Sequence, residues 1–365
     1  MDHGNSALHL LLNAGLKPPK TLTVSITNGC NLGCAHCWPQ SRHELTESPV
    51  PAQAVENLIT EFVRFGLEEV VVTGGEPLTH PDWLAILAWC CQQPDIRSVC
   101  LQTNGTLLSE VAVNGLVALG RAGLSVQVSL DGATEKTHDY VRGKGSFERA
   151  LCGLRELVQG GLGSVTRVAF TEMRHNFDEI PSLLDILSEM GVGGLVTGAL
   201  VRKGRAAASH RLALPTPSQY RKLLERYHLD PGFRLAYERI ANISVIEWYK
   251  GRAHGLGGVC RCIESPYVTA DGRMYPCALL QADECAAVNV YGRSLAEVLC
   301  ESLPLWSKLP ETSRRRALEL KRCRRCPGLP HCGGGCMGRA HAAHGQFMRE
   351  EDRCLLRKVA YTFCA

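Results

Sequence analysis

The feature that most constrains the fold is an alternation, from about residue 20 to residue 225, of short runs rich in β-branched residues with longer helical segments. Parallel strands need a crossover between them, usually a helix, and the alternation supplies one each time. We therefore expect an α/β fold with right-handed crossovers, curled into a partial (β/α)6 TIM-like barrel, with function at the carboxyl ends of the strands. The six expected strands are residues 21–27, 69–73, 98–103, 124–130, 165–170 and 194–200.

Two of the amphipathic segments also carry signals for helix ends. The apolar residues of 55–62 recur at i, i+3, i+4 and i+7, which predicts one buried helix face. A second segment, residues 180–187, repeats this pattern. Asn176 and Glu179 precede it as an expected capping pair, and Gly191 follows it as an expected stop.

Towards the C-terminus the apolar residues lose their regular spacing, and turn-forming residues and cysteines become frequent. Residues 267–277 predict a hairpin with its turn at Asp271-Gly272. A region with so little periodicity needs another source of stability, and metal ligation would supply it. The expected organisation is an N-terminal extension (1–20), the partial barrel (21–225), a helical connector (226–254) and a cysteine-rich domain (255–365).

Composition narrows the class of protein further. The net charge of +4 over 365 residues gives no argument for binding nucleic acid or a membrane surface. No run approaches the roughly eighteen apolar residues that span a bilayer. The short apolar run 8–16 lacks the basic flank of a signal peptide, so we expect a cytoplasmic protein.

Eighteen cysteines in such a chain are unusual, and in a reducing compartment clustered cysteines more often bind metal than form disulfides. Eleven fall into groups, at positions 30, 34 and 37, at 260, 262 and 277, and at 323, 326, 332 and 336 with 354 following. The other seven are expected to be small buried residues or spare thiols. They are Cys90, Cys91, Cys100, Cys152, Cys285, Cys300 and Cys364.

The first group directly follows the first expected strand. Cys30, Cys34 and Cys37, on one tight loop, can hold three corners of an iron–sulfur cubane and leave the fourth iron open. Zinc is the main alternative, but a closed structural zinc site needs four ligands and usually has paired CxxC spacing. His36 could be a fourth ligand, although its place between two ligands makes that geometry awkward. The residues favour an iron–sulfur cluster.

This CxxxCxφC pattern after the first strand resembles the hallmark of the radical S-adenosylmethionine (SAM) superfamily, with His36 at the position that is usually aromatic. The resemblance implies that SAM chelates the open iron through its amino and carboxylate groups. It also implies that His36 lies against the adenine.

Three further strand-end features resemble motifs of the same superfamily: a GGEP turn, a TNG element and an SxDG…HD…RG pattern. The resemblance implies that Glu76 receives the SAM amino group, and the two glycines before it would let the backbone approach a ligand. Arg142 could pair bidentately with the SAM carboxylate. Taken alone, the GGEP motif could be an ordinary turn and Arg142 a surface residue. The residues placed near SAM are Gly74, Gly75, Glu76, Asn104, Ser129, Asp131 and Arg142.

The C-terminal cysteines match the seven-cysteine signature of the SPASM subfamily, which implies two auxiliary [4Fe–4S] clusters and so three clusters in all. Cys260 lies outside this signature. It can be a fourth ligand of the inner cluster only if the backbone bends there, and otherwise one inner iron stays open for substrate. The resemblance assigns Cys323, Cys326, Cys332 and Cys354 to a distal cluster, and Cys262, Cys277 and Cys336 to an inner one.

Basic residues crowd the approach to the last cysteine group. They could form a solvated helix face, screen the anionic clusters, or dock an acidic leader peptide. The residues are Arg314, Arg315, Arg316, Lys321, Arg322, Arg324 and Arg325.

The resemblance implies an enzyme that cleaves SAM reductively to a 5′-deoxyadenosyl radical and oxidatively modifies a peptide or protein, for example by crosslink or thioether formation. An external flavodoxin or ferredoxin would supply electrons. Relatives that modify sulfatases carry an aspartate where this chain has Ala278, so that activity lacks its expected base. The alternatives are a small-molecule or tetrapyrrole substrate, a non-catalytic electron-transfer protein, and a zinc scaffold.

Overall fold

The computed structural model describes residues 3–39, 41, 49–120, 122–251 and 260–364, and one nine-stranded sheet organises it. The strand order is β7-β6-β5-β4-β3-β2-β1-β8-β9, and all neighbours are parallel except the last pair. The order does not close on itself, so the barrel is partial, as expected. The six expected strands are present as β1 (Thr21–Ser25), β2 (Glu69–Thr73), β3 (Ser98–Thr103), β4 (Leu124–Ser129), β5 (Thr166–Glu172) and β6 (Gly194–Ala199).

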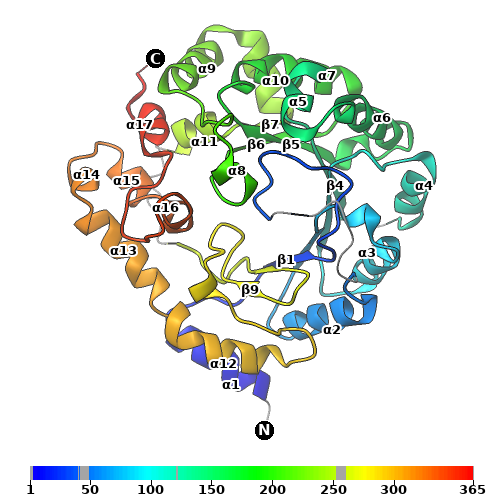
Figure 1. Ribbon diagram of the computed structural model, residues 1–365, viewed down its shortest axis with the longest axis vertical. Coiled ribbons are helices and arrows are strands. Elements are labelled where there is room, and N and C mark those ends of the chain that lie inside the picture. The colour runs from blue at the N-terminus through cyan, green and yellow to red at the C-terminus, as the bar shows by residue number, and fades with distance from the viewer. Residues whose placement is uncertain (1–2, 40, 42–48, 121, 252–259, 365) are drawn as a thin grey trace.

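Helices cover the outside of this sheet (Figure 1). Val55, Leu58, Ile59 and Phe62 are the buried residues of α2, as their spacing predicts. Fully burying a side chain of this size contributes about 1.5–3 kcal/mol. The helices that follow the strands of the barrel are α2 (Ala52–Val63), α3 (Trp83–Gln92), α4 (Glu110–Ala118), α5 (Glu135–Arg142), α6 (Ser146–Gln159) and α7 (Ile180–Met190).

The expected capping pair before α7 is wrong. Glu179 ends a short 3-10 helix, Phe177–Glu179, and its carboxylate accepts a hydrogen bond from the Ala133 N–H at 2.7 Å. Asn176 instead donates to the carbonyls of Asp131 and Thr171 at 3.0 and 2.9 Å. Both side chains therefore tie strand-end loops together instead of capping the helix. The expected stop is confirmed, because Gly191 caps α7 with φ +79.

Beyond β6 the chain continues through four helices and a two-residue strand. These are α8 (Arg205–Ala208), α9 (Pro217–Leu229), α10 (Pro231–Ile240), β7 (Ala241–Asn242) and α11 (Ser244–Gly251). Strand β7 pairs in parallel with β6 and so extends the sheet beyond the six expected strands.

The expected hairpin is confirmed as β8 (Tyr267–Val268) and β9 (Met274–Tyr275), an antiparallel pair with Gly272 in its turn at φ +78. It is not separate from the barrel, because β8 pairs in parallel with β1. The C-terminal segment therefore completes the sheet edge beside the first cysteine loop (Figure 1).

The rest of the C-terminal region is largely helical, whereas the sequence predicted turns and cysteines with little apolar periodicity. Helix α12 buries Leu295, Val298, Leu299 and Trp306. Helices α14 and α15 have only four residues each, too short for an apolar repeat to show in the sequence. The helices are α12 (Leu295–Trp306), α13 (Leu309–Glu319), α14 (Lys321–Arg324), α15 (Leu329–Cys332), α16 (Met337–His344) and α17 (Cys354–Thr362).

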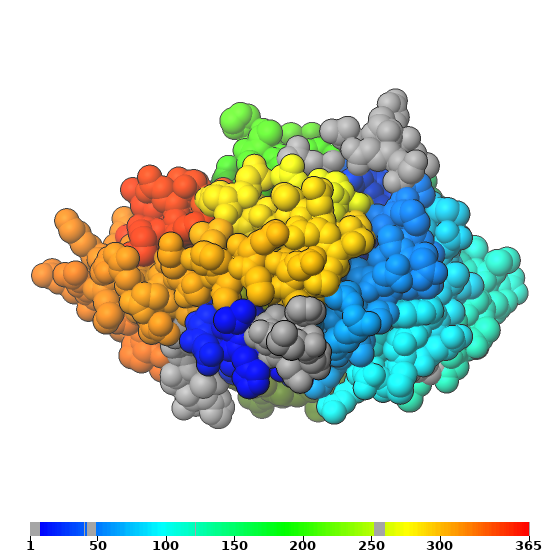
Figure 2. Space-filling view, turned by 90° about the horizontal axis from the view of Figure 1, so that it is seen from below, coloured from blue at the N-terminus to red at the C-terminus, as the bar shows by residue number. Residues whose placement is uncertain are grey.

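The N-terminal residues pack onto this region. Helix α1 (His3–Asn13) contacts α12, and the two lie side by side in Figures 1 and 2. Leu11 and Leu16 are buried in the main core. Within the described part of the chain, no helix is long and apolar enough to span a membrane.

One buried arginine joins the C-terminal region to the barrel. Arg339, on α16, donates to the carbonyls of Ala199 and Leu200 at 3.0 and 2.5 Å, just at the end of β6. It also pairs with both carboxylate oxygens of Asp352, at 2.8 and 2.9 Å. The side chain is 2% exposed, so all these contacts are protected from water.

We predict that Arg339→Met lowers the free energy of unfolding by about 3–5 kcal/mol, because Asp352 would remain buried without its partner. Thermal denaturation followed by circular dichroism measures the change. Arg349→Met, at an exposed position, is the matched control. Equal melting temperatures for the two variants would contradict the structural role of Arg339.

Candidate active site and metal centres

A cavity of about 420 Å³ opens at the carboxyl ends of the strands, where the fold class predicts function. This volume suits a small cofactor. Nine of the sequence-predicted residues line it: Cys30, Cys34, His36, Cys37, Gly74, Gly75, Asn104, Ser129 and Arg142. Residues that the sequence did not single out complete the wall, among them Gln102, Gln127, Thr171, Arg205, Leu279, Arg339 and Arg353.

The loop that carries the first cysteine group is tied to the end of β3. Asn104 donates from Nδ2 to Oδ1 of Asn31 at 2.8 Å, and Asn31 donates to the Thr106 hydroxyl at 2.8 Å. The Cys30 sulfur accepts a hydrogen bond from the Leu32 N–H at 3.4 Å. The TNG element, Thr103-Asn104-Gly105, therefore positions the cysteine loop through Asn104 and also contributes to the lining of the cavity.

Burial raises the pKa of Cys30 to about 12. A metal binds the thiolate and not the thiol, so a strongly electropositive centre must compensate for this burial. Three thiols that line one cavity, those of Cys30, Cys34 and Cys37, fit an iron–sulfur cluster with one open iron.

Arg205, at the start of α8, holds the far side of the same loop. It donates from Nε to the Cys34 carbonyl at 2.9 Å and from Nη1 to the Ser41 carbonyl at 2.7 Å. Its backbone N–H donates to the Cys37 carbonyl at 3.1 Å. No motif marks this arginine, so the sequence could not identify it.

The glycines of the GGEP turn serve a contact within the protein. A Cβ on Gly75 would lie 2.2 Å from the Gly29 carbonyl oxygen, and one on Gly74 would lie 2.8 Å from that of Thr27. The Gly75 N–H donates to Thr27 at 2.7 Å, and the Glu76 N–H donates to Gly29 at 2.8 Å. The two glycines thus allow the turn to press against the segment that leads directly into Cys30.

Glu76 is fully buried and does not line the cavity. Its Oε1 accepts from the Thr103 hydroxyl at 2.6 Å, and its Oε2 accepts from the Asn104 N–H at 2.7 Å. Burial raises its pKa to about 7, against the effect of these donors. In this structure Glu76 therefore anchors the turn to the end of β3.

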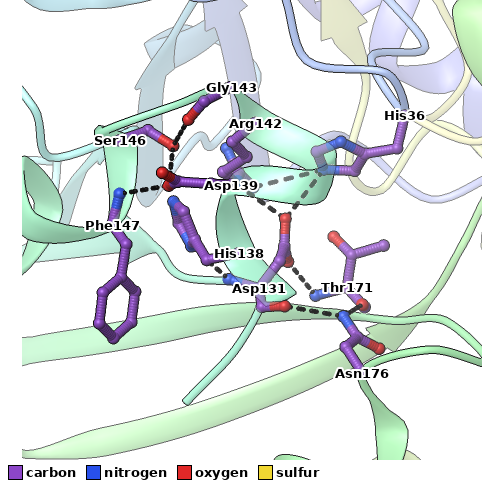
Figure 3. A network of polar contacts seen from close by, with 10 residues as sticks. All are labelled: His36, Asp131, His138, Asp139, Arg142, Gly143, Ser146, Phe147, Thr171 and Asn176. Atoms are coloured by element: carbon purple, nitrogen blue, oxygen red, sulfur yellow. Dashed lines mark hydrogen bonds and ion pairs between the residues drawn. The ribbon is translucent and has the colours of Figure 1, made fainter. Parts of the chain in front are cut away.

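A second buried carboxylate, Asp131, holds together a network of polar contacts beside the cavity-lining residues His36 and Arg142 (Figure 3). Asp131 Oδ2 pairs with Arg142 Nε at 2.7 Å and with His36 Nε2 at 3.1 Å. Its Oδ1 accepts from the Thr171 N–H at 2.7 Å. Burial alone would raise the pKa of Asp131, but Arg142 and His36 hold it well below its usual range. Asp131 stays ionised and fixes both of these side chains.

The same network includes His138 and Asp139, the His-Asp dipeptide of the SxDG…HD…RG pattern. Nδ1 of His138 accepts from the Asp131 N–H at 3.0 Å, and burial lowers the pKa of His138 to about 4, so its ring is neutral. Asp139 caps the next helix, accepting from the Phe147 N–H at 2.9 Å and the Ser146 hydroxyl at 3.0 Å. These residues position Arg142 without reaching the cavity themselves.

The four cysteines of the expected distal group line one small cavity of about 30 Å³, together with Glu350, Glu351 and Arg357. They are Cys323, Cys326, Cys332 and Cys354. Burial raises the pKa of Cys323 to about 11, and the neighbouring thiols act in the same direction. The structure thus gathers in one place a set that spans more than thirty residues of sequence.

The inner group includes Cys260. Its thiol hydrogen-bonds that of Cys262, and together with burial this raises its pKa far above the ordinary value. Charges at Cys260 and Cys336 add to burial in raising the pKa of Cys277 to about 12. Ile263, directly after Cys262, has φ +78, which is unusual for a β-branched residue.

Among the described residues, no three cysteine, histidine, aspartate or glutamate side chains form a group arranged to hold a single metal ion. The fit of the three groups to clusters therefore rests on the donor chemistry and on the loops that gather the thiols. Of the other seven cysteines, Cys90, Cys91 and Cys285 are buried, and Cys152, Cys300 and Cys364 are exposed.

The basic residues before the last group divide into two kinds. Six are exposed and fit a solvated surface, for example Arg314 and Arg315, which pair with glutamates on their own helix. Arg316 is completely buried.

The strand-end cavity, the cysteine loop that lines it and the GGEP turn together define a radical SAM enzyme. The sequence matches the profile of the Radical SAM superfamily over residues 24–199. It is 30% identical over 361 residues to the AdoMet-dependent heme synthase of Methanosarcina barkeri, covering 93% of this chain and 97% of the relative. The chain belongs to the radical SAM superfamily, whose members bind SAM and a [4Fe–4S] cluster.

Two further similarities concern a maturase and a protein solved with a precursor peptide. The chain is 28% identical to the mycofactocin maturase MftC of Mycobacterium ulcerans, covering 88% of this chain and 84% of the relative. The structure of Streptococcus suis SuiB bound to the precursor peptide SuiA superposes with a TM-score of 0.75 at 18% identity, covering 95% of this chain and 78% of SuiB. This superposition confirms the fold of the whole chain.

We predict that Gly75→Ala destabilises the fold by about 1–3 kcal/mol, because the added Cβ collides with the Gly29 backbone. Displacing that segment should also reduce the iron bound after anaerobic reconstitution. Gly251→Ala, where a Cβ meets no atom within 4 Å, is the control. A Gly75→Ala protein with normal stability and iron content would contradict this account of the turn.

We predict that Arg142→Lys weakens SAM binding roughly 10- to 100-fold, because lysine cannot both pair with Asp131 and offer a planar donor pair to a carboxylate. Equilibrium dialysis of the reconstituted protein with labelled SAM measures the affinity. Arg149→Lys, at an exposed position on α6, should bind SAM normally. Unchanged affinity in Arg142→Lys would exclude Arg142 as the carboxylate ligand.

Proposed function

We propose that this radical SAM enzyme oxidatively modifies a peptide or protein and carries two auxiliary [4Fe–4S] clusters beside the SAM-binding one. The observation that carries the proposal is the position of the 420 Å³ cavity between two cysteine groups. Its lining includes Cys30, Cys34 and Cys37, and also Leu279 and Arg339, which closely follow Cys277 and Cys336 in the chain. A substrate in the cavity would lie between the centre that starts the reaction and one that can accept an electron.

When bound, SAM and the first cluster supply a 5′-deoxyadenosyl radical that abstracts a hydrogen atom. The chain itself binds and orients. Arg142, held by Asp131, offers its terminal nitrogens to the SAM carboxylate, and Ser129 lines the same wall. Gln102 and Gln127, on β3 and β4, also line the cavity and could hydrogen-bond a polar substrate. An external flavodoxin or ferredoxin would supply the electron.

We also propose that Cys260 is the fourth ligand of the inner cluster, beside Cys262, Cys277 and Cys336. The Ile263 N–H donates to the Pro276 carbonyl at 2.8 Å and so brings the Cys260-x-Cys262 segment beside Cys277, which supports this ligand set. The inner cluster would then have no open iron to bind the substrate, so protein side chains would bind it instead. Residues 255–365 would form the auxiliary-cluster domain and 226–254 the connector. Residues 252–259 lie outside the described part of the chain.

Cys260→Ala should therefore lose the iron of one whole cluster after anaerobic reconstitution. Counting iron and acid-labile sulfide measures the loss. Cys300→Ala, an exposed cysteine outside the groups, is the control and should keep the full content. Full cluster content in Cys260→Ala would mean that the inner cluster has an open iron.

A tetrapyrrole substrate is the second candidate, favoured by the 30% identity to a heme synthase over nearly its whole length. Both candidates predict SAM-dependent formation of 5′-deoxyadenosine with dithionite as reductant, and Cys37→Ala should abolish it. A non-catalytic electron carrier or a zinc scaffold would form none in either case.

Mass spectrometry of the substrates separates the two candidates. Short peptides encoded beside the gene should become lighter by two hydrogens if the protein is a peptide maturase that forms a crosslink. Conversion of Fe-coproporphyrin III, with the peptides unchanged, would support the tetrapyrrole candidate and overturn the peptide one.

A further inference from the structure

Helix α13 contacts both proposed auxiliary cluster sites. Its buried face carries Ser313 and Arg316, three residues apart, which are 3% and 0% exposed. The Ser313 hydroxyl accepts a hydrogen bond from the backbone N–H of Cys260, in the inner group, at 2.9 Å. The carbonyl of Leu320, just beyond the helix, accepts one from the N–H of Cys323, in the distal group, at 2.9 Å.

A triple-glycine loop joins the two groups and packs against this helix. It runs from Cys332 of the distal group to Cys336 of the inner group, and its glycines have φ of +60, +89 and +73. Arg316 donates from Nη2 to the Gly334 carbonyl at 2.9 Å. A Cβ on Gly334 would lie 2.8 Å from the Ala317 nitrogen, so glycine is needed for this approach. Arg316 therefore lies against the shortest connection between the two sites.

The remaining donors of Arg316, on Nε and Nη1, are buried and have no hydrogen-bond partner among the described residues. Leaving a buried donor unsatisfied costs about 1–3 kcal/mol, and more when the group is charged. Such a group in a native fold calls for an acceptor that the chain itself does not supply.

The nearest buried carboxylate does not fill this role. Glu351 pairs with Arg353 at 3.0 Å and with Arg357, and accepts a hydrogen bond from the Cys336 N–H at 3.1 Å. Although burial alone would raise it, these two arginines lower the pKa of Glu351 to about 2. Glu351 is thus shared by two other cations, while two nitrogens of Arg316 have no partner among the described residues.

The electrostatic surroundings of Arg316 include thiols of both groups. Burial lowers the pKa of its guanidinium, whereas the charges of Glu351, Cys336, Cys323 and Cys332 act in the opposite direction. Arginine stays protonated in proteins, so its positive charge is permanent. That charge is felt at the inner group through Cys336 and at the distal group through Cys323 and Cys332.

We infer that Arg316 is a cation shared by the two auxiliary clusters, donating its free N–H groups to cluster or cysteinyl sulfur and raising the reduction potentials of both. The inference rests on the proposal that both cysteine groups hold clusters. Net charge and hydrogen bonds to sulfur are among the factors that set such potentials. One side chain would then make both auxiliary clusters better acceptors for the electron that the substrate radical gives up.

The test is an EPR-monitored redox titration of the full chain after anaerobic reconstitution. Cys30→Ala/Cys34→Ala/Cys37→Ala serves as the background, so that only auxiliary clusters contribute. Arg316→Gln should lower both midpoint potentials, shifting the ratio of reduced to oxidised cluster about tenfold at a fixed potential. This corresponds to about 59 mV for a one-electron couple. Arg315→Gln, exposed on the same helix and paired only with Glu319, should leave both potentials unchanged.

Unchanged potentials in Arg316→Gln, with its iron content intact, would overturn the inference. If that variant fails to hold clusters, Arg316→Lys decides, because it keeps the charge and loses the planar donor pair. A fall in both potentials then supports the inference, whereas unchanged potentials overturn the hydrogen bonds to sulfur that it requires. Iron counting of the background protein distinguishes failure of this inference from failure of the proposed function. Absence of auxiliary iron in that protein would overturn the proposed auxiliary clusters themselves.

Discussion

Burial of thiol groups is the constraint on which the rest of this structure depends. The cysteines of all three groups are partly or fully buried, and burial raises the pKa of Cys34 and Cys332 above the ordinary value. Thiolates in such places need positive charge nearby. Arg142 lowers the pKa of Cys34, and Arg357 lowers that of Cys332, in each case against the effect of burial.

Two buried carboxylates hold these arginines in place, Asp131 for Arg142 and Glu351 for Arg357. The pairs keep the guanidinium groups fixed and ionised beside the thiols. Arg316 differs because it lacks an acid of its own, which is why its free donors carry the inference about the auxiliary clusters. The protein thus places fixed positive charges beside its cysteine groups, and the side chains involved are far apart in sequence.

Much of the fold could be predicted from sequence, because the β-α alternation is local and regular. The eleven grouped cysteines could also be identified, since ligand spacing is a local property. The contacts that hold the site together could not. Arg205 and Arg339 act through carbonyls of distant segments, and no motif marks them. The GGEP glycines were interpreted as leaving room for a ligand, although the space is occupied by residues 27–29.

The central claim is that Cys30, Cys34 and Cys37 hold a cluster that binds SAM and is distinct from two others. EPR spectra of the dithionite-reduced protein, recorded with and without SAM, test it most directly. The account predicts that SAM changes the signal of one cluster only, and that Cys34→Ala abolishes this change while the remaining signals persist. A spectrum that SAM leaves unaltered, or a reconstituted protein that contains zinc and no iron, would contradict it.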